Sequence, residues 1–161
     1  SVGHGKVVPP NPRDREVLLT YLLHRSTKVG TRLRRHGLQE QGFSSGLRSA
    51  EGWLGGRLQS ALPTSDGRNI MALCRQVINE TWQGQGIHQV QVTALNPCNT
   101  DSQLELFTAT DNIRDEVNAV MDTVNQRYGE LVLAPARLLN RSSMPNVIAP
   151  AWKPFGHRKT I

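Results

Sequence analysis

The chain has 161 residues and is basic, with 19 Lys and Arg against 13 Asp and Glu and a net charge of +6. Hydrophobic residues make up 37% of it, and no run approaches the roughly 18–20 apolar residues of a membrane-spanning helix, which excludes such a helix. The two cysteines, Cys74 and Cys98, are too few for a disulfide framework and fit a reducing cytoplasm. Basic surfaces attract polyanions, nucleic acid first, although a basic charge alone also fits an ordinary soluble protein.

The first predicted elements are a short strand and a long helix. Lys6–Val8 is a strand candidate that ends at the two prolines following it. Asn11 is a good N-cap with Pro12 at the first helical position, and Gly37 is a natural C-terminal stop. The apolar stripe of this helix consists of Leu18, Leu19, Leu22, Leu23, Val29 and Leu33.

Two strands follow, because helical periodicity is lost and glycines punctuate the sequence. They are predicted over residues 39–49 and 53–62, joined by a turn at Ala50–Gly52. In the second strand, the residues predicted to face the core are Leu54, Leu58 and Leu62, and those predicted to face away are Arg57 and Gln59.

A second helix and a fourth strand complete this part of the chain. The helix is predicted after Asp66, with a clear apolar stripe, and ends at Gly84. Residues 87–95 alternate strictly, which predicts a strand. Its two faces consist of Val90, Val92 and Ala94 on one side and Gln89, Gln91 and Thr93 on the other.

The order strand, helix, strand, strand, helix, strand is the split β-α-β pattern (β-α-β-β-α-β). It predicts an α+β domain over residues 1–95, with an antiparallel four-stranded sheet and both helices on one face. The other face should be open and polar, which suits contacts with a nucleic-acid backbone, although a solvated face is ordinary for such sheets. The residues expected there are Arg57, Gln59, Gln89, Gln91 and Thr93, with Lys6 and Arg48 near the ends.

The chain changes character beyond Pro97. Residues 96–110 have the composition of a linker, yet they contain the apolar run SQLELF at positions 102–107. Such a run either forms an edge strand of the protein's own sheet or is offered to a groove on another protein.

A C-terminal helix and a basic tail are predicted over residues 111–161. The helix follows a cap at Asp111 or the threonine before it and ends at Gly129. Residues 130–139 are a short strand candidate, and the Pro-, Ser-, Lys- and Arg-rich residues 140–161 are expected to be irregular. The apolar stripe of the helix consists of Ile113, Val117, Val120, Met121 and Val124.

No catalytic or metal motif emerges from the residues. The histidines have no zinc-ligand spacing with the cysteines, and GWLGG at 52–56 lacks the Lys-Ser/Thr that follows in a phosphate-binding loop. We therefore predict no catalytic residue and no metal ligand. The chain begins at Ser1 rather than Met, which predicts a fragment of a longer protein.

Several segments together resemble one protein family. SVGHGKVVPP, RDREVLLTYLLHRSTKVGTRLRR, GWLGGRLQSALPTSDGRNI and QVQVTAL look like the little-finger domain of Y-family translesion DNA polymerases, of the DNA polymerase IV and UmuC types. SQLELF resembles the sliding-clamp-binding motif that follows this domain in the family, a Gln-Leu-x-Leu-Phe pattern. VMDTVNQRYG resembles the C-terminal extension of UmuC-type proteins.

The resemblance implies a non-catalytic C-terminal part of an error-prone translesion polymerase, active in DNA repair and SOS-type damage tolerance, cytoplasmic and associated with the nucleoid. It implies no cofactor here, because Mg²⁺ is expected only in the separate catalytic domain. The implied partners are double-stranded DNA and the bacterial sliding clamp, without a membrane. The implied clamp contacts are Gln103, Leu104, Leu106 and Phe107. The implied DNA contacts are Lys6, Arg48, Arg57, Gln59, Gln89, Gln91 and Thr93.

Two alternatives remain at the level of sequence. A stand-alone split β-α-β module that binds single-stranded RNA would need aromatic rings on the open face, where Trp53 is the one candidate. A small enzyme would need a pocket with convergent titratable groups, and the sequence indicates none.

Overall fold

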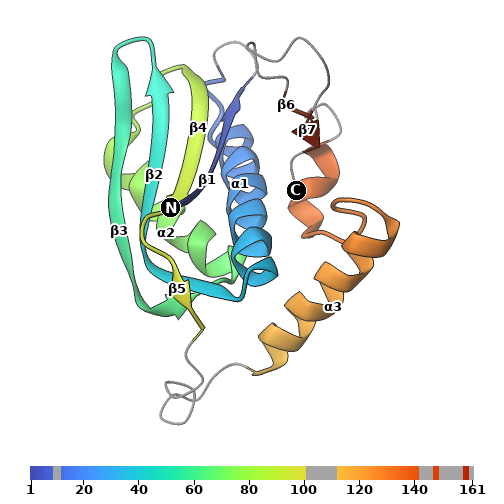
Figure 1. Ribbon diagram of the computed structural model, residues 1–161. Coiled ribbons are helices and arrows are strands. Elements are labelled where there is room, and N and C mark those ends of the chain that lie inside the picture. Colours follow the sequence, from blue (N-terminus) through green and yellow to red (C-terminus); the bar gives the residue numbers. More distant parts are fainter. Residues whose placement is uncertain (9–11, 101–111, 142–146, 149–157, 160–161) are drawn as a thin grey trace.

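The first six elements follow the predicted order. The computed structural model describes residues 1–8, 12–100, 112–141, 147–148 and 158–159. These elements are β1 (Val2–Val7), α1 (Arg15–Arg35), β2 (Leu38–Ser49), β3 (Gly52–Thr64), α2 (Gly67–Thr81) and β4 (Ile87–Ala94). Figure 1 shows α1 and α2 packed against one face of the sheet, so the predicted α+β architecture is confirmed.

The main sheet has the strand order β1-β4-β2-β3, and every pairing is antiparallel. The first and fourth strands of the sequence are therefore neighbours, with Val2 opposite Ala94. The predicted alternation of β4 is confirmed, because Val90, Val92 and Ala94 are fully buried against the helices.

The core lies between the sheet and the two helices. All six residues of the predicted α1 stripe are buried, and Phe43 and Leu47 of β2 meet them from the sheet. Asp66 caps α2 as predicted by accepting a hydrogen bond from the Arg68 amide at 2.8 Å. The predicted start of α1, with Asn11 as N-cap and Pro12 as the first helical residue, was wrong: α1 begins at Arg15, and its cap is Asp14, which accepts from the Glu16 amide at 2.8 Å. Asn11 itself lies outside the described residues.

Two strands differ from their predicted form. β1 begins at Val2 rather than Lys6, because the residues from Val2 onward already pair with β4; a Cβ at Gly3 would lie 2.9 Å from the Thr93 hydroxyl, so glycine allows this close pairing. In β3, Leu62 was predicted to face the core but is 51% exposed. The register shifts between Glu40 and Gly42, so the alternation of β3 does not continue to its end.

The predicted linker begins with an additional strand. β5 (Cys98–Asn99) pairs with the first two residues of β2, and the Thr100 amide donates to the Gly37 carbonyl at 3.0 Å. The buried carboxylate of Glu40 accepts hydrogen bonds from the amides of Gln41, Gly42 and Asn96. These contacts hold the chain to the domain up to residue 100, five residues beyond the predicted boundary.

A third layer covers the outer side of α1. α3 (Asn112–Tyr128) confirms the predicted C-terminal helix, and the 3-10 helix η2 (Ala136–Arg141) follows it (Figure 1). The strand predicted over residues 130–139 was wrong. The Asn125 side chain donates to the Leu133 carbonyl and accepts from the Leu133 amide, both at 2.8 Å, which fixes a turn there instead.

The C-terminal tail, predicted to be irregular, contains one short strand pair among its described residues. β6 (Val147–Ile148) pairs with β7 (Arg158–Lys159). Among the helices described, none is long and apolar enough to cross a membrane.

Candidate nucleic-acid interface

The open face of the sheet is organised in three cross-strand rows. Paired residues of neighbouring strands point to the same face, so the strand registers define the rows. The Trp53 row contains Val7, Gln89, Arg48 and Trp53. The glycine row contains Gly5, Gln91, Gly46 and Gly55. The Arg57 row contains Gly3, Thr93, Ser44 and Arg57.

Both arginines predicted for this face are exposed. Arg48 belongs to the Trp53 row, and its guanidinium carbon lies 5.9 Å from the centroid of the Trp53 ring, a cation–π arrangement. Arg57 lies two rows away on β3. The glycine row between them carries a single side chain, Gln91, and the Trp53 ring leans over its Gly46 from the neighbouring row.

The amides and hydroxyls predicted for the open face are also found there. Gln91 donates to the Thr93 hydroxyl at 3.3 Å, and Gln89 stands opposite Arg48. Gln59 is exposed opposite Gly42, beyond the Arg57 row. Six of the seven predicted residues therefore share this face, but whether they contact DNA stays a prediction.

Lys6 is the exception, and its predicted position was wrong. It pairs with the fully buried Val90, so it points toward the helices rather than the open face. Burial lowers the pKa of Lys6, and the positive charges of Arg25 and Lys28 lower it further. Since successive strand residues alternate between faces, the register of β1 decides this placement.

Beneath β1 lies a buried basic cluster that sequence reasoning missed. Arg25 is 1% exposed and donates to His4 Nδ1 at 2.8 Å and to His24 Nδ1 at 2.6 Å. Burial lowers the pKa of His4 to about 3, with the Arg25 charge as the next cause, and burial lowers the pKa of Arg25 to about 10. The neutral His4 ring therefore accepts from the charged guanidinium, which ties β1 to α1. The signal in the sequence was a charged residue at a position of the α1 stripe, between Leu22 and Val29.

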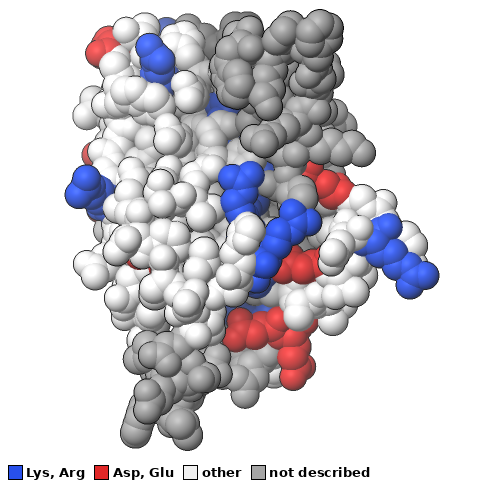
Figure 2. Space-filling view, in the orientation of Figure 1, with Lys and Arg blue, Asp and Glu red and all other residues white. Residues whose placement is uncertain are grey.

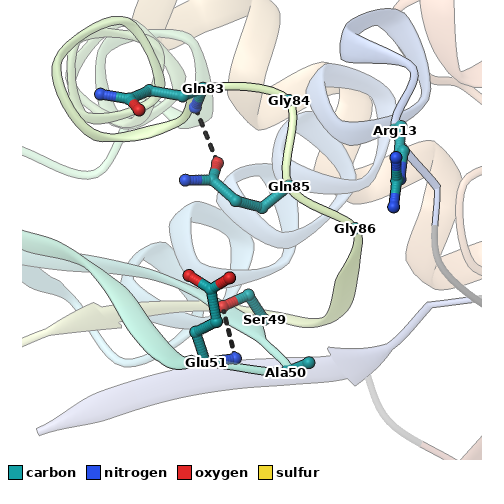
Figure 3. Close-up of a pocket in the computed structure, with 8 residues that line it drawn as sticks. All are labelled: Arg13, Ser49, Ala50, Glu51, Gln83, Gly84, Gln85 and Gly86. Atoms are coloured by element: carbon teal, nitrogen blue, oxygen red, sulfur yellow. Dashed lines mark hydrogen bonds between the residues drawn. The ribbon is translucent and has the colours of Figure 1, made fainter.

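A polar pocket of about 340 Å³ lies beyond one end of the sheet (Figure 3). The Ser49 hydroxyl donates to the Gly52 carbonyl and accepts from the Glu51 amide, both at 3.2 Å, so it is already engaged in the β2–β3 turn. Arg13 and Glu51 are the only lining residues with ionisable side chains. The lining residues are Arg13, Ser49, Ala50, Glu51, Gln83, Gly84, Gln85 and Gly86.

The pocket contains none of the predicted site residues. Across the residues that the structure describes, no group of three or more His, Cys, Asp or Glu side chains could hold a metal ion. The residues predicted to bind the clamp, Gln103, Leu104, Leu106 and Phe107, lie outside the described residues.

Charged side chains also gather away from the sheet, where α3 and η2 meet α1. In Figure 2, acidic and basic groups lie side by side over this part of the molecule. Asp122 of α3 accepts two hydrogen bonds from Arg34, at 2.6 and 2.9 Å, and Glu130 pairs with the buried Lys28. These arginine and lysine side chains are engaged within the protein.

Comparison with known proteins identifies relatives of this chain. The model of the impB/mucB/samB family C-terminal domain matches residues 1–106. UvrX of Bacillus subtilis (strain 168), a protein named for UV-damage repair, is 26% identical over 141 residues. That alignment covers 84% of this chain and 34% of UvrX, so the chain spans about a third of the length of this relative. Since 84% of the chain is more than 106 residues, the similarity reaches beyond the family domain.

One solved structure also resembles the fold. It is a complex of the beta-clamp processivity factor and the little finger domain of PolIV, with 15% sequence identity and a TM-score of 0.49. The match covers 63% of this chain and 94% of that chain. The family match, in contrast, spans well over half of the chain and agrees with the resemblance seen in the sequence. This protein therefore belongs to the impB/mucB/samB family and contains its C-terminal domain.

Proposed function

We propose that this chain is the DNA-backbone-binding and sliding-clamp-binding C-terminal part of an error-prone translesion DNA polymerase. The observation that carries the proposal is the open sheet face, where the Trp53 row and the Arg57 row flank the glycine row. The chain itself would make no DNA, and Mg²⁺ would act in a separate catalytic domain. It would work in the cytoplasm at the nucleoid, in SOS-type damage tolerance.

The spacing of the two arginines supports a position beside a duplex. Arg48 and Arg57 lie two rows apart, and rows on one face are separated by two residues, so the distance along the strands is about 13 Å. The major groove of B-DNA is about 12 Å wide. The two guanidinium groups would therefore reach phosphates on opposite sides of the groove, while the glycines between them allow close approach.

Contacts of this kind hold the duplex without reading its sequence. Phosphate contacts position a protein on DNA, whereas base contacts specify sequence. An RNA-binding sheet would instead use two or three aromatic rings, and the three rows contain one, that of Trp53. The geometry and the family membership therefore favour duplex DNA over a stand-alone RNA-binding module.

Titration of labelled duplexes of unrelated sequence at two salt concentrations tests the DNA-binding proposal. Affinity should fall steeply with salt, because phosphate contacts release counterions. Arg57→Ala should weaken binding equally for all sequences and reduce the salt slope by about 1. Arg75→Ala, which removes an exposed arginine from α2, is the matched control and should leave binding unchanged. A strong preference for one sequence would contradict the proposal.

The clamp-binding proposal rests on the SQLELF motif and on its position directly after the last residues bonded to the domain. The Thr100 amide is bonded to the Gly37 carbonyl, so the motif begins two residues after a fixed point of the domain. Leu106 and Phe107 would fill an apolar pocket of the clamp, and Gln103 would add a hydrogen bond that fixes the register.

Clamp titration of Leu106→Ala with Phe107→Ala tests this proposal. Removal of buried anchors costs about 2 kcal/mol or more, some thirtyfold in affinity. Gln103→Ala should cost less, and Glu105→Ala is the control that should bind as well as wild type. The melting temperature of the Leu106→Ala, Phe107→Ala double variant should equal that of wild type. Full clamp affinity with a large loss of stability would mean that the motif belongs to the protein's own core.

A further inference from the structure

Trp53 is the one aromatic side chain in the three rows of the open face, and it is 52% exposed. Tryptophan side chains are highly buried on average and are enriched at interfaces. The other exposed member of its row with a large apolar side chain is Val7, at the opposite end. Between them stand Gln89 and Arg48, so the row combines an aromatic face with hydrogen-bond donors.

The ring is held in a defined position above the sheet. A Cβ added at Gly46 would lie 3.1 Å from both Cε3 and Cζ3 of Trp53, so the ring leans over the glycine row and only glycine leaves full room for it. The guanidinium of Arg48 lies 5.9 Å from the ring centroid on the same row. Gly55, opposite Gly46, has φ +139, and a Cβ there would lie 2.1 Å from the Ser45 carbonyl oxygen. Glycine therefore leaves room for the ring at position 46, and the neighbouring backbone requires glycine at position 55.

A ring held in this position can stack on a second flat group. Its position is already supported by the sheet and by Arg48, so contact with a second flat group requires little further ordering of the side chain. Nucleobases offer such a flat face, and stacking of a base on an aromatic side chain contributes to affinity for every base type.

A base pair inside a duplex cannot make this contact, since both of its faces are covered by its neighbours. Away from the ends of a duplex, only an unpaired nucleotide, in an overhang or gap, exposes a face. We propose that Trp53, supported by Gly46 and flanked by Arg48, stacks on an unpaired nucleobase next to the duplex bound by the open face. The inference rests on the proposed function. It adds a site that distinguishes a junction of double- and single-stranded DNA from continuous duplex.

The structural alternative is that Trp53 only stabilises the β2–β3 hairpin. Aromatic rings that cover cross-strand glycines do stabilise sheets. In that case the loss of the ring would lower thermal stability and would change affinity for junction and blunt DNA by the same factor.

The test compares two DNAs of equal total length, one blunt and one with a single-stranded overhang, bound by the full 161-residue chain. Trp53→Ala should weaken binding to the overhang DNA by about fivefold or more and leave blunt-duplex affinity within about twofold. Trp53→Phe, which keeps an aromatic ring, should retain most of the overhang affinity. Arg57→Ala is the contrast, since it should weaken binding to both DNAs by the same factor.

Tryptophan emission provides a second readout that does not depend on the stability of the alanine variant. Overhang DNA should quench wild-type emission more than blunt DNA does, and this difference should disappear in Trp53→Phe, whose remaining tryptophans are Trp82 and Trp152. The inference is overturned if wild type binds both DNAs equally, or if Trp53→Ala weakens both equally or neither. If wild type binds neither DNA, the proposed function itself fails.

Discussion

α2 and α3 carry similar apolar stripes, but the stripe of α2 packs into the core and most of the stripe of α3 is exposed. In α2 the stripe is buried, with Ile70 at 0% and Ile78 at 1% exposure. In α3 three of the five stripe residues face solvent, with Ile113 at 74% and Val120 at 59% exposure, whereas Met121 and Val124 are partly buried. Both helices were predicted from the same pattern, so the pattern identifies the helix without identifying the side that packs.

The polar side of α3 provides the contact with α1. Asp122 binds the Arg34 guanidinium through both carboxylate oxygens and also accepts from the Thr31 hydroxyl at 3.3 Å. After the helix, Glu130 pairs with Lys28, and Leu131 and Leu138 insert into the main core. The extension is therefore held by ion pairs and by two apolar anchors that follow the helix in the sequence.

The largest expected effect is a difference between matched truncations in the two helices. Ile78→Ala in α2 should lower the free energy of unfolding by about 2–5 kcal/mol, because it removes buried methyl groups and leaves a cavity. Val120→Ala in α3 should change it by less than about 0.5 kcal/mol, because that side chain is already solvated. Urea unfolding of both variants measures this difference. Similar losses in the two variants would show that the α3 stripe is covered in solution.

The buried cluster of His4, His24 and Arg25 beneath β1 should make the free energy of unfolding depend on pH. The pKa of His4 falls to about 3 in the folded protein from an ordinary value of 6.5. Between these two pH values, His4 is therefore protonated in the unfolded chain but not in the folded protein. Stability should be complete above about pH 6.5 and decline as the pH falls toward 3, by up to about 1.4 kcal/mol per pH unit from this group.

His4→Asn isolates this contribution, because its amide oxygen can still accept from Arg25 but does not titrate. Unfolding free energies of wild type and variant, measured between pH 6.5 and 5, should show a shallower slope for the variant. Equal slopes would mean that His4 is protonated in the folded protein.

A smaller and local effect should follow from the loss of the α3 contact. Asp122→Asn removes the charge that binds Arg34, at a partly buried site, and should cost about 1 kcal/mol. Amide hydrogen exchange should accelerate in α3 while the protection of β4 remains. Asp115→Asn, on the exposed side of the same helix, is the control and should change neither measurement.

Sequence reasoning was accurate for most of the proposed DNA-binding face. The alternation of β4 placed Gln89, Gln91 and Thr93 opposite to its buried valines, and the structure agrees. Lys6 was misplaced because a strand of unknown register cannot be assigned to a face from three residues. Trp53 was identified as a ring near this face, but its support by Gly46 depends on the pairing of β2 with β3.

Local patterns by themselves determined the order of the two helices and four strands up to residue 95 and the Asp66 cap, because these depend on residues within a few positions of each other. Only the tertiary structure decided the pairing of β1 with β4, the arrangement of His4, His24 and Arg25, and the orientation of α3. Each of these joins segments distant in the sequence. Side-chain periodicity records that two sides of an element differ, but the partner that covers one side is set by packing and charge pairing across the folded chain.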